Sequence, residues 1–292
     1  MEPQSMSNEP LNNFIYHRRL WAHRFGITMS FFAMMIGLFF LSWILFTLVT
    51  KGFSSINLGM ITESTPPPGA EGGGLLNAII GSAMMVGVAT LICTPIGVLA
   101  GLYLAEYGER NWFAQVTRFV TDIMLSAPSI VIGLFVYALV VANMHHFSGW
   151  AGSIAISFIA IPVIVRTTDN MLQLVPGSLR EAAYALGAPR WKVAILVRLR
   201  AVKAGVITGV LLAVARISGE TAPLLFTALN NQFFNLNMNE PMANLPVVIY
   251  QFAMSPYENW RSLAWGGALI ITLGVLLLII LSRTIFSQKI QK

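Results

Sequence analysis

The sequence predicts an all-α integral membrane protein with six transmembrane helices. Hydrophobic residues make up 56% of the 292 residues and charged residues only 10%. In a typical soluble domain, about a quarter of the residues are charged. The apolar residues are collected in six segments that can cross a hydrocarbon core, which takes about 20 residues of helix. Lys and Arg gather in the loops on one side of these segments, which explains the net charge of +6 without a nucleic-acid partner.

The six predicted spans are separated by polar or Gly- and Pro-rich loops. Residues 1–26 and 287–292 are expected to be cytoplasmic tails, the first of them poorly ordered. The first span stands apart from a core of five spans over residues 75–286. The spans lie near residues 27–50, 75–104, 116–142, 149–165, 204–229 and 263–286.

The distribution of basic residues predicts the orientation. Six spans place both termini on one side of the membrane. Of the 18 Lys and Arg residues, 15 fall on that side, whereas the opposite loops contain only Lys51 and Arg261. Positively charged loops stay in the cytoplasm, so both termini are expected there. The remaining basic residue, Arg216, lies inside the fifth span.

The largest cytoplasmic loop contains a short helix with clear end signals, in the stretch PGSLREAAYALGAP from residue 176 to 189. Ser178 and Glu181 have the spacing of a capping box, in which each side chain satisfies an N–H group at the helix start. Gly187 suits the left-handed position after a helix, and Pro189 cannot continue one. The pattern predicts a helix near 179–186.

A helix of this length is unstable alone in water and needs a surface to pack against. Ala182, Ala183 and Leu186 would form a small-sided apolar face. Two interpretations fit this face: the helix lies on the membrane, or it docks onto another protein.

The fifth span contains two charged residues in the stretch AVARISGETAPLL, from residue 213 to 225. Charged groups inside a bilayer are costly and are usually paired or functional. Arg216 and Glu220 are four residues apart, so they can pair on one helix face. The pair either fixes helix packing, or it lines an anion path in which Arg216 contacts the anion and Glu220 restrains Arg216.

Several stretches resemble the permease subunits of phosphate-specific ABC importers, of the PstA type. The run EAAYALG at 181–187 resembles the EAA loop of ABC-importer permeases, although the proline expected later in that motif is Arg200 here. The other stretches that carry the resemblance are TPPPGAEGGG at 65–74, LAEYG at 104–108, LSAPSIVIGLFVY at 125–137, HFSGWAG at 146–152 and ARISGETAPLLFTAL at 215–229.

The resemblance implies a type I ABC importer (MetI-like) permease fold in the bacterial cytoplasmic (inner) membrane. The EAA loop would be the coupling helix, with Ser178, Glu181, Ala182, Ala183, Leu186 and Gly187 at the contact with an ATPase. Arg216 and Glu220 would line the phosphate pathway. Arg166, at the end of the fourth span, would be a second guiding arginine or would simply reach the membrane interface.

The implied partners are a PstC-type permease, two copies of a PstB-type ATP-binding subunit and a PstS-type extracytoplasmic phosphate-binding protein. The chain has no GxxxxGK[ST] motif, so ATP and Mg would be used by the partner ATPase. No catalytic or metal-binding residues are expected in this chain. Intramembrane acid–base pairs also occur in proton-coupled secondary transporters, and sulfate, molybdate or phosphonate would suit a lone arginine nearly as well as phosphate.

Overall fold

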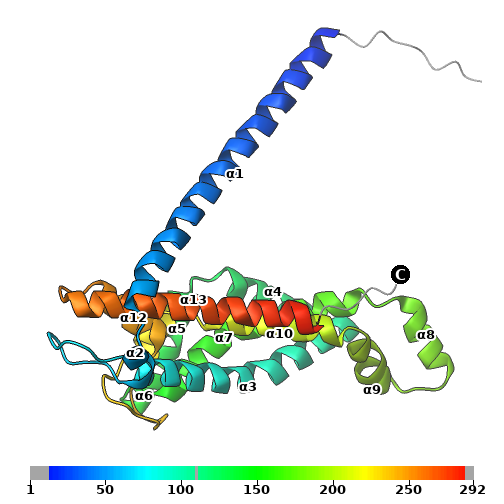
Figure 1. Ribbon diagram of the computed structural model, residues 1–292. Coiled ribbons are helices and arrows are strands. Elements are labelled where there is room, and N and C mark those ends of the chain that lie inside the picture. The colour runs from blue at the N-terminus through cyan, green and yellow to red at the C-terminus, as the bar shows by residue number, and fades with distance from the viewer. Residues whose placement is uncertain (1–12, 109–110, 287–292) are drawn as a thin grey trace, which may run out of the picture. The chain divides into compact units, whose positions relative to one another are not determined.

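The computed structural model describes residues 13–108 and 111–286, and every regular element within them is helical (Figure 1). The chain divides into two compact units, Met1–Thr50 and Lys51–Lys292. The helices, with two π-helical segments η1 and η2, are α1 (Asn13–Ser55), α2 (Leu58–Thr62), α3 (Leu76–Tyr107), α4 (Trp112–Ser126), α5 (Ser129–Val136), η1 (Tyr137–Val141), α6 (Ala142–Met144), α7 (Gly149–Gln173), α8 (Gly177–Ala185), α9 (Arg190–Lys192), η2 (Val193–Leu199), α10 (Lys203–Ile217), α11 (Ala222–Thr227), α12 (Leu245–Ala253) and α13 (Glu258–Phe286).

The described part of unit 1 is a single stretch of helix α1. It carries large apolar side chains along its length, among them Phe31 and Phe46, as expected for a membrane span. The helix begins at Asn13, whereas the sequence analysis expected a poorly ordered tail over residues 1–26. Residues 14–25 contain neither glycine nor proline, so nothing stops the helix before the apolar stretch. Residues 1–12 and the predicted tail 287–292 lie outside the described residues.

Unit 2 is built around α7. The most apolar stretch of α7 is 67% buried, against 22% in α3 and 28% in α13. Helices α3 and α10 pack against α7, and α13 packs against α10. The main core lies between α3, α7, α10 and α11 and contains Met85, Ile156, Ile217 and Leu224. The central helix of this unit is therefore the fourth predicted span.

Glycines allow α3 to approach α7 closely. A Cβ atom added at Gly97 would lie 2.7 Å from the Cβ atom of Ile164, and one added at Gly101 would lie 2.6 Å from the Cβ atom of Thr168. Small residues spaced four apart let membrane helices pack backbone against backbone. The α3–α7 pair is thus the tightly packed frame of unit 2.

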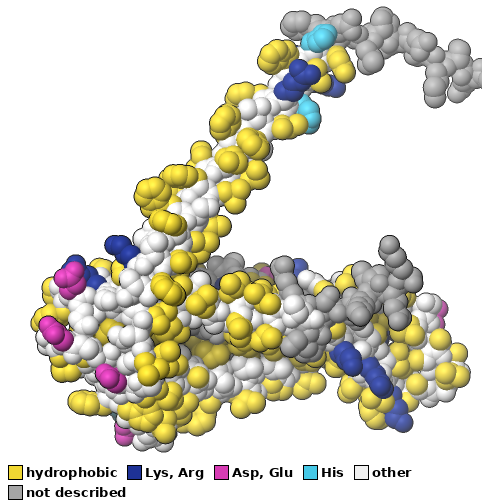
Figure 2. Space-filling view, viewed as in Figure 1, with side chains coloured by type: hydrophobic (Ala, Val, Ile, Leu, Met, Phe, Trp, Pro, Cys, Tyr) yellow, Lys and Arg dark blue, Asp and Glu magenta, His cyan; other side chains and the backbone are white. Residues whose placement is uncertain are grey.

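The two ends of unit 2 differ in character. Helices α8 and α9 lie at one end, and the loops around residues 63–75 and 228–244 lie at the other (Figure 1). Lys and Arg side chains gather at the end that carries α8 and α9, while apolar side chains cover the flanks (Figure 2). This is the end that the sequence analysis assigns to the cytoplasm.

Among the described residues, four helices contain segments long and apolar enough to cross a membrane, and a bent pair brings the number to five if it counts as one span. The four are α1, α3, α7 and α13. Two of the six predicted spans are therefore present as broken rather than continuous helices.

The third predicted span, 116–142, is not one straight helix. Helix α4 ends at Ser126, α5 begins at Ser129, and the pair is bent by 109°. Pro128 has no N–H group and forces the preceding residue out of helical geometry, and Ala127 is accordingly extended, with φ −68° and ψ 136°. The proline turns this span into two differently oriented pieces.

Candidate functional site

The fifth predicted span, 204–229, is interrupted at the charged pair. Helix α10 ends at Ile217, and α11 begins at Ala222. Pro223 cannot donate the helical hydrogen bond to the carbonyl of Gly219, and its ring would clash with that carbonyl in a continuous helix. At the end of α10, the Ser218 hydroxyl donates to the Val214 carbonyl at 2.7 Å, within the last turn of the helix. The fifth predicted span is therefore two helices separated by a break before Pro223.

Arg216 and Glu220 approach each other across the end of α10. Arg216 Nε lies 3.9 Å from Glu220 Oε1, so the predicted pairing is confirmed. This separation is longer than a hydrogen bond, and the contact leaves the donors of the guanidinium unengaged by Glu220. The Arg216 side chain is 50% exposed and the Glu220 side chain 16% exposed. A cation in the last turn also interacts favourably with the negative end of the helix.

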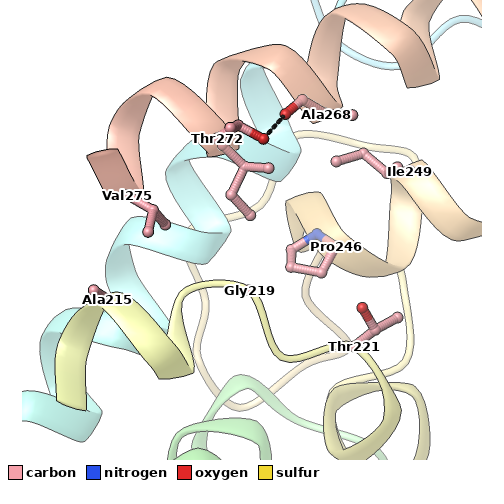
Figure 3. Close-up of a pocket in the computed structure, with 9 residues that line it drawn as sticks. Ala215, Gly219, Thr221, Pro246, Ile249, Ala268, Thr272 and Val275 are labelled. Atoms are coloured by element: carbon pink, nitrogen blue, oxygen red, sulfur yellow. Dashed lines mark hydrogen bonds between the residues drawn. The ribbon is translucent and has the colours of Figure 1, made fainter. Parts of the chain in front are cut away.

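A groove of 420 Å³ opens beside the break (Figure 3). Its walls come from the ends of α10, the 218–221 segment, α12 and α13, and they are mostly apolar. The Thr272 hydroxyl donates to the Ala268 carbonyl at 2.7 Å, so it is already engaged. Arg216 and Glu220 are not among its lining residues, which are Ala215, Gly219, Thr221, Pro246, Ile249, Ala268, Ile271, Thr272 and Val275. The groove itself thus offers an anion no charged partner.

Arg166 pairs with a carboxylate of the third predicted span. Its Nη1 atom lies 3.6 Å from Asp122 Oδ1 of α4, and both side chains are about half exposed. Gly209 of α10 faces Thr167 of α7, which places Arg216 roughly two turns, about 10 Å, further along α10. The structure therefore brings Arg216 and Glu220 together and gives Arg166 a different partner.

The predicted docking helix is present as α8, Gly177–Ala185. The left-handed conformation at Gly187 is confirmed, with φ +77°. The Gly187 N–H donates to the Tyr184 carbonyl at 2.9 Å, and the Ala188 N–H donates to the Ala183 carbonyl at 3.2 Å. These two bonds are the Schellman pattern that ends a helix.

The predicted capping box is wrong. The residue that caps the start of α8 is Pro176, and no side chain caps this end. Ser178 is the second residue inside the helix, where its hydroxyl can no longer reach the third helical N–H group. The fixed φ of proline, here −56°, starts the helix two residues earlier than a serine cap would.

The predicted contact residues of α8 lie on a surface that this chain leaves open. Leu186 is 89% exposed. Ser178, Glu181, Ala182 and Gly187 are also exposed, and Ala183 is half-buried.

Two further ion pairs, each with at least one deeply buried member, were not predicted. Arg198 of η2 binds Glu106 of α3, with the two side chains only 7% and 6% exposed. Arg118 of α4 binds Asp169 of α7, which is 2% exposed. The partners in each pair lie too far apart along the chain to be identified from spacing.

Tyr184 connects α8 to the first of these pairs. Its hydroxyl donates to Glu106 Oε1 at 3.1 Å. Partial burial and the hydrogen bond to Glu106 raise the pKa of the Tyr184 hydroxyl above its usual value. Tyr184 therefore remains a protonated donor throughout the physiological pH range. Within the described residues, no group of three or more His, Cys, Asp or Glu side chains could hold a metal ion.

Comparison with known proteins identifies the family. Residues 97–291 match the model of the family described as "Binding-protein-dependent transport system inner membrane component". Proteins named "Phosphate transport system permease protein PstA" are 59% identical in Pasteurella multocida, over 96% of this chain and 99% of the relative, and 60% identical in Haemophilus influenzae, over 95% and 98%. A protein named "Phosphate transport system permease protein PstA 1" from Mycobacterium tuberculosis is 34% identical, over 88% and 86%.

Solved structures of two transporters share the architecture. A chain of the MetNI methionine ABC transporter in an inward-facing conformation aligns with a TM-score of 0.60 at 19% identity, covering 73% of this chain and 94% of that chain. A chain of a bacterial alginate ABC transporter aligns with a TM-score of 0.60 at 14% identity, covering 96% and 98%. The predicted MetI-like permease fold is confirmed. The chain belongs to the binding-protein-dependent inner-membrane transport permeases, and within them to the permeases of the PstA type.

Proposed function

We propose that this chain is a permease subunit of an ATP-driven phosphate importer and forms half of its translocation pathway. The observation that carries the proposal is the 59–60% identity, over nearly the whole chain, to proteins named as phosphate transport permeases. The half-exposed guanidinium of Arg216 beside a helix break supplies a group whose planar donors suit phosphate oxygens. Irregular backbone at membrane depth is typical of segments that line a pathway.

The proposal divides the work among several subunits. A PstC-type permease would complete the pathway, and two PstB-type subunits would bind ATP and Mg and hydrolyse ATP. A PstS-type protein would deliver phosphate to the end of unit 2 opposite α8. The exposed contact residues of α8 and the basic side chains at that end support a cytoplasmic docking site and cytoplasmic termini.

Reconstitution with the neighbouring subunits tests the substrate and the energy source. Vesicles that contain ATP are expected to take up radiolabelled phosphate when the loaded binding protein is added outside. Excess sulfate, molybdate or phosphonate should not compete, and an ionophore that collapses the proton gradient should have no effect. Uptake without ATP, or uptake driven by the proton gradient, would point to a secondary transporter instead.

Replacing Leu186 with aspartate is expected to weaken binding of the ATP-binding subunit by about 10- to 100-fold. Full burial of a leucine side chain contributes ~1.5–3 kcal/mol, and Leu186 is 89% exposed before any partner covers it. Titration of the purified ATP-binding subunit onto permease complexes in nanodiscs measures the change. Leu58→Asp is the matched control, because Leu58 is 81% exposed at the opposite end of unit 2. Equal affinities for wild type and Leu186→Asp would contradict the docking role.

A further inference from the structure

Arg198 of η2 connects the end of α3, where it binds Glu106, to the end of α7. Besides Glu106, Arg198 binds two backbone carbonyl groups: Nη1 lies 3.4 Å from the Ala105 carbonyl and Nη2 lies 2.9 Å from the Leu172 carbonyl. Ala105 lies in the last turn of α3 and Leu172 in the last turn of α7. The carbonyl end of a helix favours a cation, so one guanidinium holds both helix ends.

The same carboxylate also holds α8. Glu106 Oε2 accepts from Arg198 and Glu106 Oε1 accepts from the Tyr184 hydroxyl. Tyr184 and Arg198 lie on opposite sides of the turn at Gly187, which ends α8 and leads into η2. Both arms of this turn therefore converge on one buried carboxylate of α3.

Separating Arg198 from Glu106 is expected to be energetically costly. The Arg198 and Glu106 side chains are almost fully buried, and an arginine left without its carboxylate in such a place is strongly disfavoured. In contrast, α8 itself contains no buried residue. Among the described residues, the helix is thus joined to the bundle by the hydrogen bond from Tyr184 to Glu106, and its other face is left open.

We propose that Tyr184, Glu106 and Arg198 form a mechanical link through which displacement of α8 reaches α3 and α7. The proposal rests on the proposed docking of α8 onto an ATPase. The three residues are positioning residues: they touch neither phosphate nor nucleotide. Because Ile164 and Thr168 of α7 pack directly onto Gly97 and Gly101 of α3, the pair is expected to move as one body when its ends are pulled.

Two substitutions test the link in the reconstituted complex with all subunits. Tyr184→Phe removes the hydroxyl that reaches Glu106 and keeps the ring, and Glu106→Gln removes the charge that holds Arg198. Both complexes are expected to bind the ATP-binding subunit as wild type does and to hydrolyse ATP. The ratio of phosphate taken up to ATP hydrolysed should fall about threefold for Tyr184→Phe and about tenfold for Glu106→Gln.

The Arg118–Asp169 pair provides the control. It joins α4 to α7, and Arg118 also donates to the Leu104 carbonyl near the end of α3 at 3.2 Å. Neither residue contacts α8 by a hydrogen bond or ion pair of the described residues. Asp169→Asn is expected to lower the melting temperature of the complex and to keep the wild-type ratio of phosphate to ATP.

The outcomes separate the link from the proposed function. Unchanged ratios for both Tyr184→Phe and Glu106→Gln, or an equal fall for Asp169→Asn, would overturn the link. If the wild-type complex shows no ATP-driven phosphate uptake, the proposed function fails first. Should Glu106→Gln not assemble, Tyr184→Phe decides the matter alone, since it removes only a hydroxyl from a half-buried ring.

Discussion

Replacing Arg216 with alanine is expected to abolish phosphate uptake, with a fall of at least about 100-fold, while the subunits still assemble. A hydrogen bond to a charged group contributes ~1.5–3 kcal/mol, and a guanidinium can make two to one phosphate. The Arg216 side chain is half exposed and only loosely paired, at 3.9 Å from Glu220. Its removal therefore costs little packing and takes away the positive charge of the proposed pathway.

Uptake into vesicles and copurification of the subunits are the two measurements. Arg216→Lys keeps the charge but not the planar fork, so a partial loss is expected. Glu220→Gln removes the carboxylate that offsets Arg216, and slower release of phosphate is expected because the local charge becomes more positive. Normal uptake by Arg216→Ala would return the pair to the structural interpretation, in which it only fixes helix packing.

The burial and the contact distance of the Arg216–Glu220 pair help to decide whether it fixes helix packing or lines a pathway. An ion pair that fixes packing inside a bilayer is expected to be close and buried, because unpaired charge is costly there. The Glu106–Arg198 pair has these properties, with both side chains less than a tenth exposed. The Arg216–Glu220 pair has neither short contact nor a buried arginine. The contrast favours a pathway role for Arg216.

The elements that can be predicted from the sequence are those with local signals. The end of α8 follows from Gly187 and Pro189, because a left-handed residue and a missing N–H group act within one turn. The beginning of α8 was predicted incorrectly, because two local signals competed there and Pro176 prevailed over Ser178. The long apolar helices α3, α7 and α13 follow from composition alone.

The breaks in the third and fifth predicted spans depend on hydrogen bonding rather than on hydropathy. A count of apolar residues does not register Pro128 and Pro223. Each proline nevertheless removes a backbone hydrogen bond and disfavours helical geometry in the residue before it. A proline such as Pro223 can bend a helix or break it, and which of the two happens depends on the packing of the segment that follows. That packing comes from α5, which lies far from α11 in the sequence.

The buried ion pairs could not be identified from spacing for a related reason. Arg198 lies 92 residues from Glu106, and Arg118 lies 51 residues from Asp169. Charges near the predicted ends of spans are common, and nothing local distinguishes one that reaches water from one that is buried. Only the close approach of α3 and α7, which brings Glu106 and the Leu172 carbonyl within reach of one guanidinium, creates the site that Arg198 fills.

Replacing Gly133 with alanine is expected to destabilise the protein by about 1–3 kcal/mol and to impair uptake, because α5 holds α11 through this residue. A Cβ atom at Gly133 would lie 2.6 Å from the Cα atom of Pro223, a backbone atom that cannot rotate away. The new methyl group must push α11 outward, together with the 218–221 segment that carries Glu220. Gly87→Ala in α3 is the matched control, since a Cβ atom there meets nothing within 4 Å. Alanine is the better helix former, so this variant should keep or slightly raise the melting temperature. Equal melting temperatures and uptake for the two variants would show that the α5–α11 contact does not position the broken helix.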